Sequence, residues 1–299
     1  MPEPQSFPLK EKIDKREKQL SHSAIKGYRS MLSLIFRTRI PEISSSTVIK
    51  DLLRSFEIKV LKTSINPPSW DLNKVLFYLM EPPFEPLNNS DLRTLTMKVL
   101  FLVALATAKR VGELQAISKN VARQGDSLSL SYVPEFLAKT ESASNPLPRS
   151  FMIKSLKDFA GDLPEGSKLC PVRAIKHYLT RTASIVDRPR TLFVSPNKPS
   201  RSITKNAISF FLRKLICDAG ASHENEDRTP RAHSIRSMGT SVAFLRNWKV
   251  SSILTAATWK SPSVFTSFYL KDIEFQLDEM HSLGPFVAAG QVVNSSSSK

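Results

Sequence analysis

The apolar residues in the first 70 positions recur mostly three or four residues apart, which is the spacing of a helix that buries one face. One helix is expected up to about Arg37, with Ser21 or Ser23 as its N-cap, and a second is expected over residues 46–61. Residues 66–70 (Asn-Pro-Pro-Ser-Trp) then break the pattern, and this composition is typical of a linker between two domains.

The most apolar stretch of the chain lies beyond this linker. A helix is expected over residues 71–80, and the prolines of residues 81–86 end it. A long and nearly all-apolar helix then runs from Ser90 or Asp91 to Ala108. Because it is apolar on almost every face, we expect this helix to lie buried at the centre of the second domain.

Apolar and polar residues alternate strictly over residues 127–133, which predicts a β-strand. Residues 151–153 are its expected partner, after a proline-containing turn at 145–148. The resulting hairpin presents Lys139 and Thr140 near its tip.

The rest of the chain again favours helices, over residues 171–183, 204–219, 232–246, 250–257 and 262–269. Residues 282–299 end in a run of serines and are expected to form a loose tail. No internal repeat is present. The pattern therefore predicts a mainly α protein with one small antiparallel β-sheet, which is an α+β fold.

The charge of the chain indicates a polyanionic partner. Among 299 residues, 43 are Lys or Arg and 27 are Asp or Glu, which gives a net charge of +16. Such an excess favours nucleic acid, whose phosphates release counterions when cations replace them. A basic protein without such a partner is the alternative at this stage. Because 41% of the residues are hydrophobic, the chain can bury a proper core.

Several classes of protein are excluded by the composition. The only cysteines, Cys170 and Cys217, are far apart, which argues against a disulfide framework or a zinc site. The longest apolar run, Val99 to Ala106, is too short to span a bilayer. The N-terminus lacks the basic and apolar regions of a signal peptide. We therefore expect an intracellular protein.

Two pairs of residues could handle a phosphate. His233 and Arg236 are three positions apart, so they share a helix face and could grip one phosphate together. The alternative is a solvated helix start. Arg110 and Glu113 are also three apart, and the carboxylate could orient the guanidinium toward an anion. A surface ion pair is commoner, but this pair follows the most apolar helix of the chain.

For three more side chains, spacing alone does not indicate a function. Trp259 and Tyr269 are equally compatible with core positions, and Lys139 is distinguished only by its place on the hairpin. The residues by themselves therefore support a basic, phosphate-handling protein.

The order of these residues resembles the tyrosine recombinase (phage integrase) family. The segments 108–114 (Ala-Lys-Arg-Val-Gly-Glu-Leu), 136–140 (Phe-Leu-Ala-Lys-Thr) and 267–272 (Ser-Phe-Tyr-Leu-Lys-Asp) are most similar to recombinases of DIRS-type retrotransposons. The resemblance covers residues 69–275 well and residues 1–66 more loosely. The six positions that match in order are Arg110, Lys139, His233, Arg236, Trp259 and Tyr269.

The resemblance implies a role for each of these residues. Tyr269 would be the nucleophile that forms a 3′-phosphotyrosyl link and frees a 5′-hydroxyl, which needs neither ATP nor a metal or other cofactor. Arg110 and Arg236 would bind the non-bridging oxygens of the phosphate, and His233 would act as a base or orienting donor. Lys139 would protonate the leaving 5′-oxygen.

Two more residues would support this site. Trp259 stands where many members have a second histidine, and its indole N–H could donate to the phosphate but could not transfer a proton. Glu113 would hold Arg110.

The resemblance also implies an architecture and partners. Residues 1–66 would form a helical (SAM-like) core-binding domain that lacks its first helix, residues 67–281 the catalytic domain, and residues 282–299 a flexible tail. The partner would be double-stranded DNA, bound by a homotetramer on paired sites, with no membrane involved. Residues 272–281 could be lent to a neighbouring subunit or could dock on their own domain. The protein would act in the nucleus of a eukaryote, or in the cytoplasm or nucleoid of a bacterium.

One departure from the family concerns the nucleophile. The interval from Trp259 to Tyr269 is one residue longer than usual, so we expect a shift or a bulge in the tyrosine helix. Two alternatives to a recombinase are a catalytically silent DNA-binding relative and an enzyme similar to type IB topoisomerases. Loss of Arg110, Arg236 or Tyr269 would indicate the silent relative, but all six positions are filled.

Overall fold

The computed structural model describes residues 22–36, 46–51, 70–139, 141, 148–157, 164–221, 230–245, 247–259, 262 and 265–270. The chain divides into two compact units, Met1–Ser64 and Ile65–Lys299. The first unit contains helix α1 (His22–Ile35) and a helical turn at 47–51. The remainder of the helix expected over 46–61, most of the linker, residues 272–281 and the tail 282–299 lie outside the described residues. The domain boundaries therefore stay predictions.

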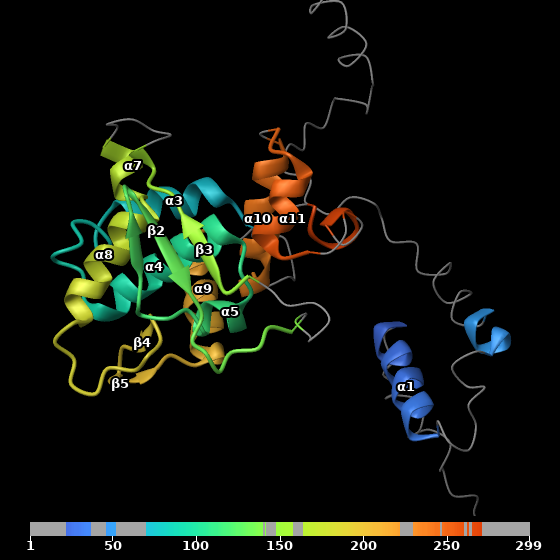
Figure 1. Ribbon diagram of the computed structural model, residues 1–299. Helices are drawn as coiled ribbons and strands as arrows, with labels where there is room; N and C mark the ends of the chain where they lie inside the picture. Colours follow the sequence, from blue (N-terminus) through green and yellow to red (C-terminus); the bar gives the residue numbers. More distant parts are fainter. Residues whose placement is uncertain are drawn as a thin grey trace, which may run out of the picture. The chain divides into compact units, whose positions relative to one another are not determined.

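The second unit is mainly α with small antiparallel sheets, as the sequence predicts (Figure 1). Its helices are α3 (Leu72–Met80), α4 (Leu92–Thr107), α5 (Val111–Gln115), α7 (Pro164–Lys168), α8 (Pro171–Thr182), α9 (Lys205–Asp218), α10 (Ala232–Leu245), α11 (Val250–Ala257) and the π-helix Phe265–Tyr269. Its strands are β1 (Ala122–Gln124), β2 (Ser127–Ser131), β3 (Ser150–Ile153), β4 (Val194–Ser195) and β5 (Lys198–Ser202). Among the described residues, no helix has the length and apolarity to cross a membrane.

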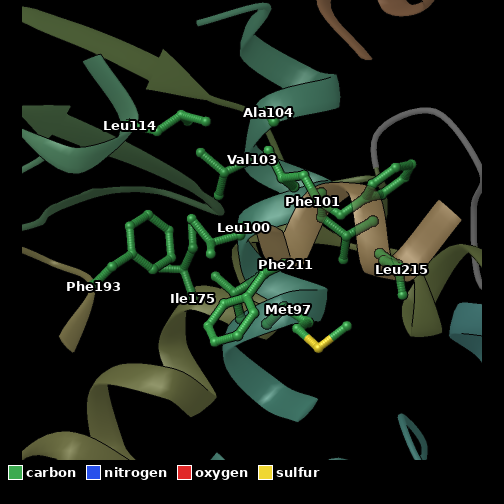
Figure 2. Packing of buried hydrophobic residues seen from close by; sticks show 14 of the residues in the cluster. Met97, Leu100, Phe101, Val103, Ala104, Leu114, Ile175, Phe193, Phe211 and Leu215 are labelled. Carbon is green, nitrogen blue, oxygen red and sulfur yellow. The ribbon is translucent and has the colours of Figure 1, made fainter. Parts of the chain in front are cut away.

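Helix α4 forms the centre of this unit. It begins where Asp91 accepts a hydrogen bond from the backbone N–H of Thr94 (2.6 Å), and most of its residues are buried. Helices α8, α9 and α10 pack around it, and Figure 2 shows the apolar side chains that meet there. The prediction of a buried central helix is confirmed. Its burial on all sides fits a sequence that is apolar on nearly every face.

The hairpin of β2 and β3 is also confirmed. The two strands are antiparallel, with Leu128 opposite Ile153, and alternate residues of β2 are buried. The expectation of a single sheet is wrong, however, because β4 and β5 form a second one. Strand β4 has only two residues, and β5 (Lys-Pro-Ser-Arg-Ser) is mostly exposed, so neither carries the alternation that predicts a strand. Strand β1 adds to the first sheet but is fully exposed, so it too lacks that signal.

A buried cluster of charges holds α4 against its neighbours. Lys98 of α4 is fully buried, and its ammonium donates to Glu85 (2.5 Å) and to the backbone carbonyl of Leu79 (2.8 Å). Arg173 of α8 donates to both carboxylate oxygens of Glu85 (2.7 and 3.1 Å). Burial alone would raise the pKa of Glu85, but the hydrogen bonds from Arg173 and Lys98 outweigh it and hold the pKa below its ordinary value.

Removal of this carboxylate is expected to destabilise the fold strongly. Glu85→Ala leaves the Lys98 ammonium buried without a counter-ion, so the free energy of unfolding should fall by about 3–5 kcal/mol. Urea denaturation measures this change. Glu135→Ala is the control, because it removes an exposed ion pair with Arg190 (3.0 Å) and should cost less than about 1 kcal/mol. Equal losses in the two variants would show that the buried cluster does not support the fold.

Candidate active site

The first part of the site is built where α4 ends. Ala108 takes a left-handed conformation (φ 49°) that stops α4, and Arg110 becomes the N-cap of α5. Glu113 accepts hydrogen bonds from the backbone N–H of Arg110 (2.6 Å) and from its guanidinium (3.4 Å). Only 3% of Glu113 is exposed, whereas the Arg110 side chain is partly exposed. The pair is therefore not a surface ion pair: a buried carboxylate holds a guanidinium that can reach a ligand.

The second part lies at the start of α10. His233 and Arg236 fall in the first turns of this helix, where His233 is only partly covered and Arg236 is only 2% exposed. A guanidinium nitrogen of Arg236 lies 3.8 Å from Glu113, so one carboxylate lies between two arginines. Burial, together with the charge of Arg110, lowers the pKa of Arg236 to about 10, which leaves it protonated at neutral pH.

The third part is the segment that carries Tyr269. The backbone N–H of Leu270 donates to the carbonyl of Phe265 (2.8 Å), which is the i to i+5 hydrogen bond of a π-helix. The structure thus has a π-helical segment just before Tyr269, in the interval where the sequence analysis predicts a shift or a bulge. With this geometry, the Tyr269 hydroxyl lies 2.8 Å from Nε2 of His233.

Trp259 completes the cluster. Its ring lies 4.6 Å from the Arg236 guanidinium carbon and 4.4 Å from the Tyr269 ring. The indole Nε1 of Trp259 and the Nε and Nη1 groups of Arg236 are buried, and none of them finds a hydrogen-bond acceptor among the described residues. Because buried donors in proteins are nearly always paired, these three groups indicate that the site accommodates an acceptor-rich ligand such as an oxyanion.

The architecture matches solved structures of integrases. A Tn1549 transposon integrase in complex with circular intermediate DNA matches 92% of this chain and 80% of its own, with a TM-score of 0.54 and 13% identity. A lambda integrase from a tetramer bound to a Holliday junction matches 87% of this chain with a TM-score of 0.50 and 15% identity, and this chain covers 62% of that one. The chain has the fold of a tyrosine recombinase. No protein-family model and no curated protein matches its sequence.

Lys139 is the one member of the predicted set that the described structure does not bring to the others. It lies in an exposed turn of the segment that connects β2 to β3, and Thr140 and residues 142–147 of that segment are outside the described residues. No contact joins Lys139 to the other predicted site residues within the described part of this recombinase fold. Its role stays a prediction.

Several residues that support the site carry no sequence signal. The backbone carbonyl of Ala257 accepts a hydrogen bond from Arg236, and the hydroxyl of Thr258 lies 3.4 Å from Glu113. Trp70 donates to Ser234 (2.7 Å) and so anchors the start of α10. Each of these contacts joins residues at least 21 positions apart, so helix or strand spacing could not have predicted it.

Gly239 sets how closely α10 approaches α4. A Cβ atom at this position would lie 2.8 Å from the backbone carbonyl oxygen of Leu105, which is too close for any other residue without a shift of the helix. Glycine therefore permits the close packing of α10 on α4 that holds Arg236 beside Glu113.

Within the described residues, no group of three or more His, Cys, Asp or Glu side chains is placed to hold a metal ion.

Proposed function

We propose that this protein is a DNA strand-transfer enzyme that cuts and rejoins DNA through a phosphotyrosyl intermediate on Tyr269. One observation carries the proposal: the Tyr269 hydroxyl is hydrogen-bonded to His233 beside buried donors that have no acceptor. A phosphodiester supplies what this site lacks, since its non-bridging oxygens are acceptors and its phosphorus is the target of a nucleophile. The net charge of +16 supports DNA as the source of that phosphodiester.

The proposed reaction gives each of these side chains one step. The Tyr269 oxygen attacks phosphorus, its proton passes to His233, and the bond between phosphorus and the 5′-oxygen breaks. Arg110 and Arg236 bind the non-bridging oxygens, where charge gathers in the transition state. The resemblance to the family, rather than its position, assigns to Lys139 the proton that the leaving 5′-oxygen takes up. Attack of a 5′-hydroxyl on the phosphotyrosyl bond reverses these steps, so the bond energy is conserved.

The wider assignment rests on the sequence. The similarity to DIRS-type recombinases supports an origin in a mobile element, and in a eukaryotic host such an enzyme acts in the nucleus. Site-specific recombination requires paired DNA sites, so the proposed assembly is a homotetramer on double-stranded DNA, with Trp259 and Glu113 supporting each active site.

A trapped intermediate tests the function. A labelled pool of duplexes with random sequence and a nick at one position lets the short cleaved fragment diffuse away, so the covalent product accumulates. We expect a labelled protein–DNA adduct on denaturing gels, and mass spectrometry should place the DNA on Tyr269. An adduct on another residue, or no adduct with any member of the pool, would overturn the proposal.

The protonation of His233 predicts the pH dependence of cleavage. Partial burial, together with the nearby Arg236 and Arg110, lowers the pKa of His233 below its ordinary value. The imidazole is therefore neutral at neutral pH and can accept the proton of Tyr269. Single-turnover cleavage should therefore keep more than half of its rate at neutral pH when the pH falls to about 6.5, the ordinary pKa, and should fall below half only in more acidic buffer.

The free energy of unfolding should also decrease as the pH falls. The unfolded chain takes up the His233 proton at a higher pH than the folded chain, so acidification below about 6.5 favours unfolding. An NMR titration of the imidazole measures the pKa directly. A rate that already halves at or above pH 6.5, or a His233→Gln variant with an unchanged pH profile, would contradict the assignment.

A further inference from the structure

Lys109 is buried without a partner that balances its charge. Only 8% of the residue is exposed, and its ammonium lies over the Phe151 ring at 4.9 Å. Within the described part of the chain, no hydrogen bond or ion pair reaches it. Lys98, the other buried lysine near the core, has both Glu85 and a backbone carbonyl as acceptors. The Lys109 ammonium is not fully enclosed, but it lies in a largely buried residue without a protein acceptor, which is costly. Lys109 therefore needs an explanation that Lys98 does not.

The nearest carboxylate does not supply the missing partner. Glu113 is already shared by Arg110 (3.4 Å) and Arg236 (3.8 Å). Burial lowers the pKa of Lys109, Glu113 opposes this, and Arg236 and Arg110 lower the pKa further. The local charge is therefore positive, and an anion beside Lys109 would relieve it.

A cavity of about 510 Å³ provides the space for such an anion. It lies between the end of α4, strand β3 and helix α11, and Lys109 forms part of its wall. No acidic side chain is among its described lining residues. Six lining residues carry hydroxyl groups, but those of Thr107, Thr255 and Thr258 already donate to backbone carbonyls. The hydroxyl groups of Ser150, Ser251 and Ser252 remain as donors. An ammonium and three serine hydroxyl donors around one cavity suit an oxyanion.

We propose that this cavity is a second anion site, which takes a backbone phosphate of the DNA strand next to the phosphate held by Arg110. The inference rests on the proposed function, because it takes DNA as the ligand. Lys109 and Arg110 are consecutive residues, and a DNA strand carries one phosphate per about 3.4 Å of helix axis. A strand whose cleaved phosphate lies on Arg110 therefore has a neighbouring phosphate within reach of the cavity.

The first test compares two lysine substitutions in the protein without DNA. Lys109→Met removes an unpaired charge from the interior, so its melting temperature should rise by a few degrees. Lys98→Met removes the partner of Glu85 and should lower the melting temperature. A clear fall for Lys109→Met would show that the ammonium supports the fold, and this would overturn the proposal.

The second test measures how DNA affinity depends on salt. A Tyr269→Phe background prevents cleavage, and the probe is a duplex of about 40 base pairs with a random sequence. Lys109→Met in this background should lose one phosphate contact, which weakens binding and reduces the slope of log K against log salt by about 0.9. Lys109→Arg should keep most of the slope because it keeps the charge. The control is Lys176→Met, which removes an exposed lysine of α8. This helix packs on α4, and Lys176 is not among the residues that line the cavity.

The outcomes separate this inference from the proposed function. If Lys109→Met and Lys176→Met change the slope equally, or Lys109→Met leaves it unchanged, the second phosphate site is wrong, while the adduct on Tyr269 still tests the enzyme. If the slope falls only in Lys109→Met but no adduct forms, the site stands and the strand transfer fails. If inorganic phosphate raises the melting temperature of wild type but not of Lys109→Met while the DNA slope is unchanged, the ligand is a free anion and not DNA.

Discussion

Replacing Tyr269 by phenylalanine is expected to abolish the covalent adduct with nicked DNA. The substitution removes only the hydroxyl that lies 2.8 Å from His233, so the nucleophile is lost. Its ring still packs on Trp259 (4.4 Å), so the fold and DNA binding should be retained. Loss of a nucleophile costs about 10⁶-fold in the chemical step of other enzymes, which here places the product below detection. Denaturing gels of labelled DNA measure the adduct, and a filter-binding assay checks the affinity.

Tyr132→Phe is the matched control for this variant. Tyr132 is half-buried close to Glu113 and packs its ring on Phe136 (5.1 Å) and Phe151 (5.5 Å), but it does not contact His233. Removal of its hydroxyl should leave the adduct near the wild-type level. An adduct that persists in Tyr269→Phe, or that disappears equally in Tyr132→Phe, would exclude Tyr269 as the nucleophile.

Arg236→Ala is expected to lower the cleavage rate at saturating DNA by at least about 10²–10³-fold. Removing one donor that stabilises the transition state has this effect in other enzymes, and Arg236 has two buried N–H groups without an acceptor. Arg236→Lys should recover little of the rate, since an ammonium lacks the planar fork that binds two phosphate oxygens at once. Single-turnover kinetics measure the effect.

Stability must be measured alongside, because Arg236 also has a structural role. Its side chain donates to the carbonyl of Ala257 and stacks on Trp259, so Arg236→Ala should also be less stable. Cleavage rates are therefore compared at a temperature where urea denaturation shows both proteins folded. Arg181→Ala is the control, since this exposed residue of α8 donates only to the carbonyl of Asn88 (3.1 Å). If folded Arg236→Ala cleaves as fast as Arg181→Ala, Arg236 does not stabilise the transition state.

Much of the fold follows from local patterns in the sequence. Helix α4 is apolar on nearly every face, and the structure buries it at the centre, because such a helix can satisfy its surface only inside a core. The alternation along β2 predicts both the strand and its buried face. Strands β1, β4 and β5 escape prediction, because they are short or exposed and are formed by pairing with neighbours rather than by burial of alternate residues.

The candidate site also has parts that the sequence predicts and parts that only the structure shows. Spacing alone places His233 and Arg236 on one face of a helix, and Arg110 beside Glu113, since these pairs lie within one turn. The resemblance to the tyrosine recombinase family implies an irregularity before Tyr269, but only the hydrogen bond from Leu270 to Phe265 identifies it as a π-helix.

The sequence by itself predicted most of the described helices, though not α5 and α7, together with the central helix and the two local pairs, because each depends on residues a few positions apart. Composition alone gave the positive charge. Only the tertiary structure decided which groups meet across the chain. It placed Glu113 between two arginines and the Tyr269 hydroxyl on His233, and it paired Lys98 with Glu85 while it left Lys109 without an acceptor. The contacts of Arg236 and Tyr269 join residues far apart in the sequence and depend on how α10 packs on α4, whereas the packing of α8 on α4 brings Arg173 to the Lys98–Glu85 pair.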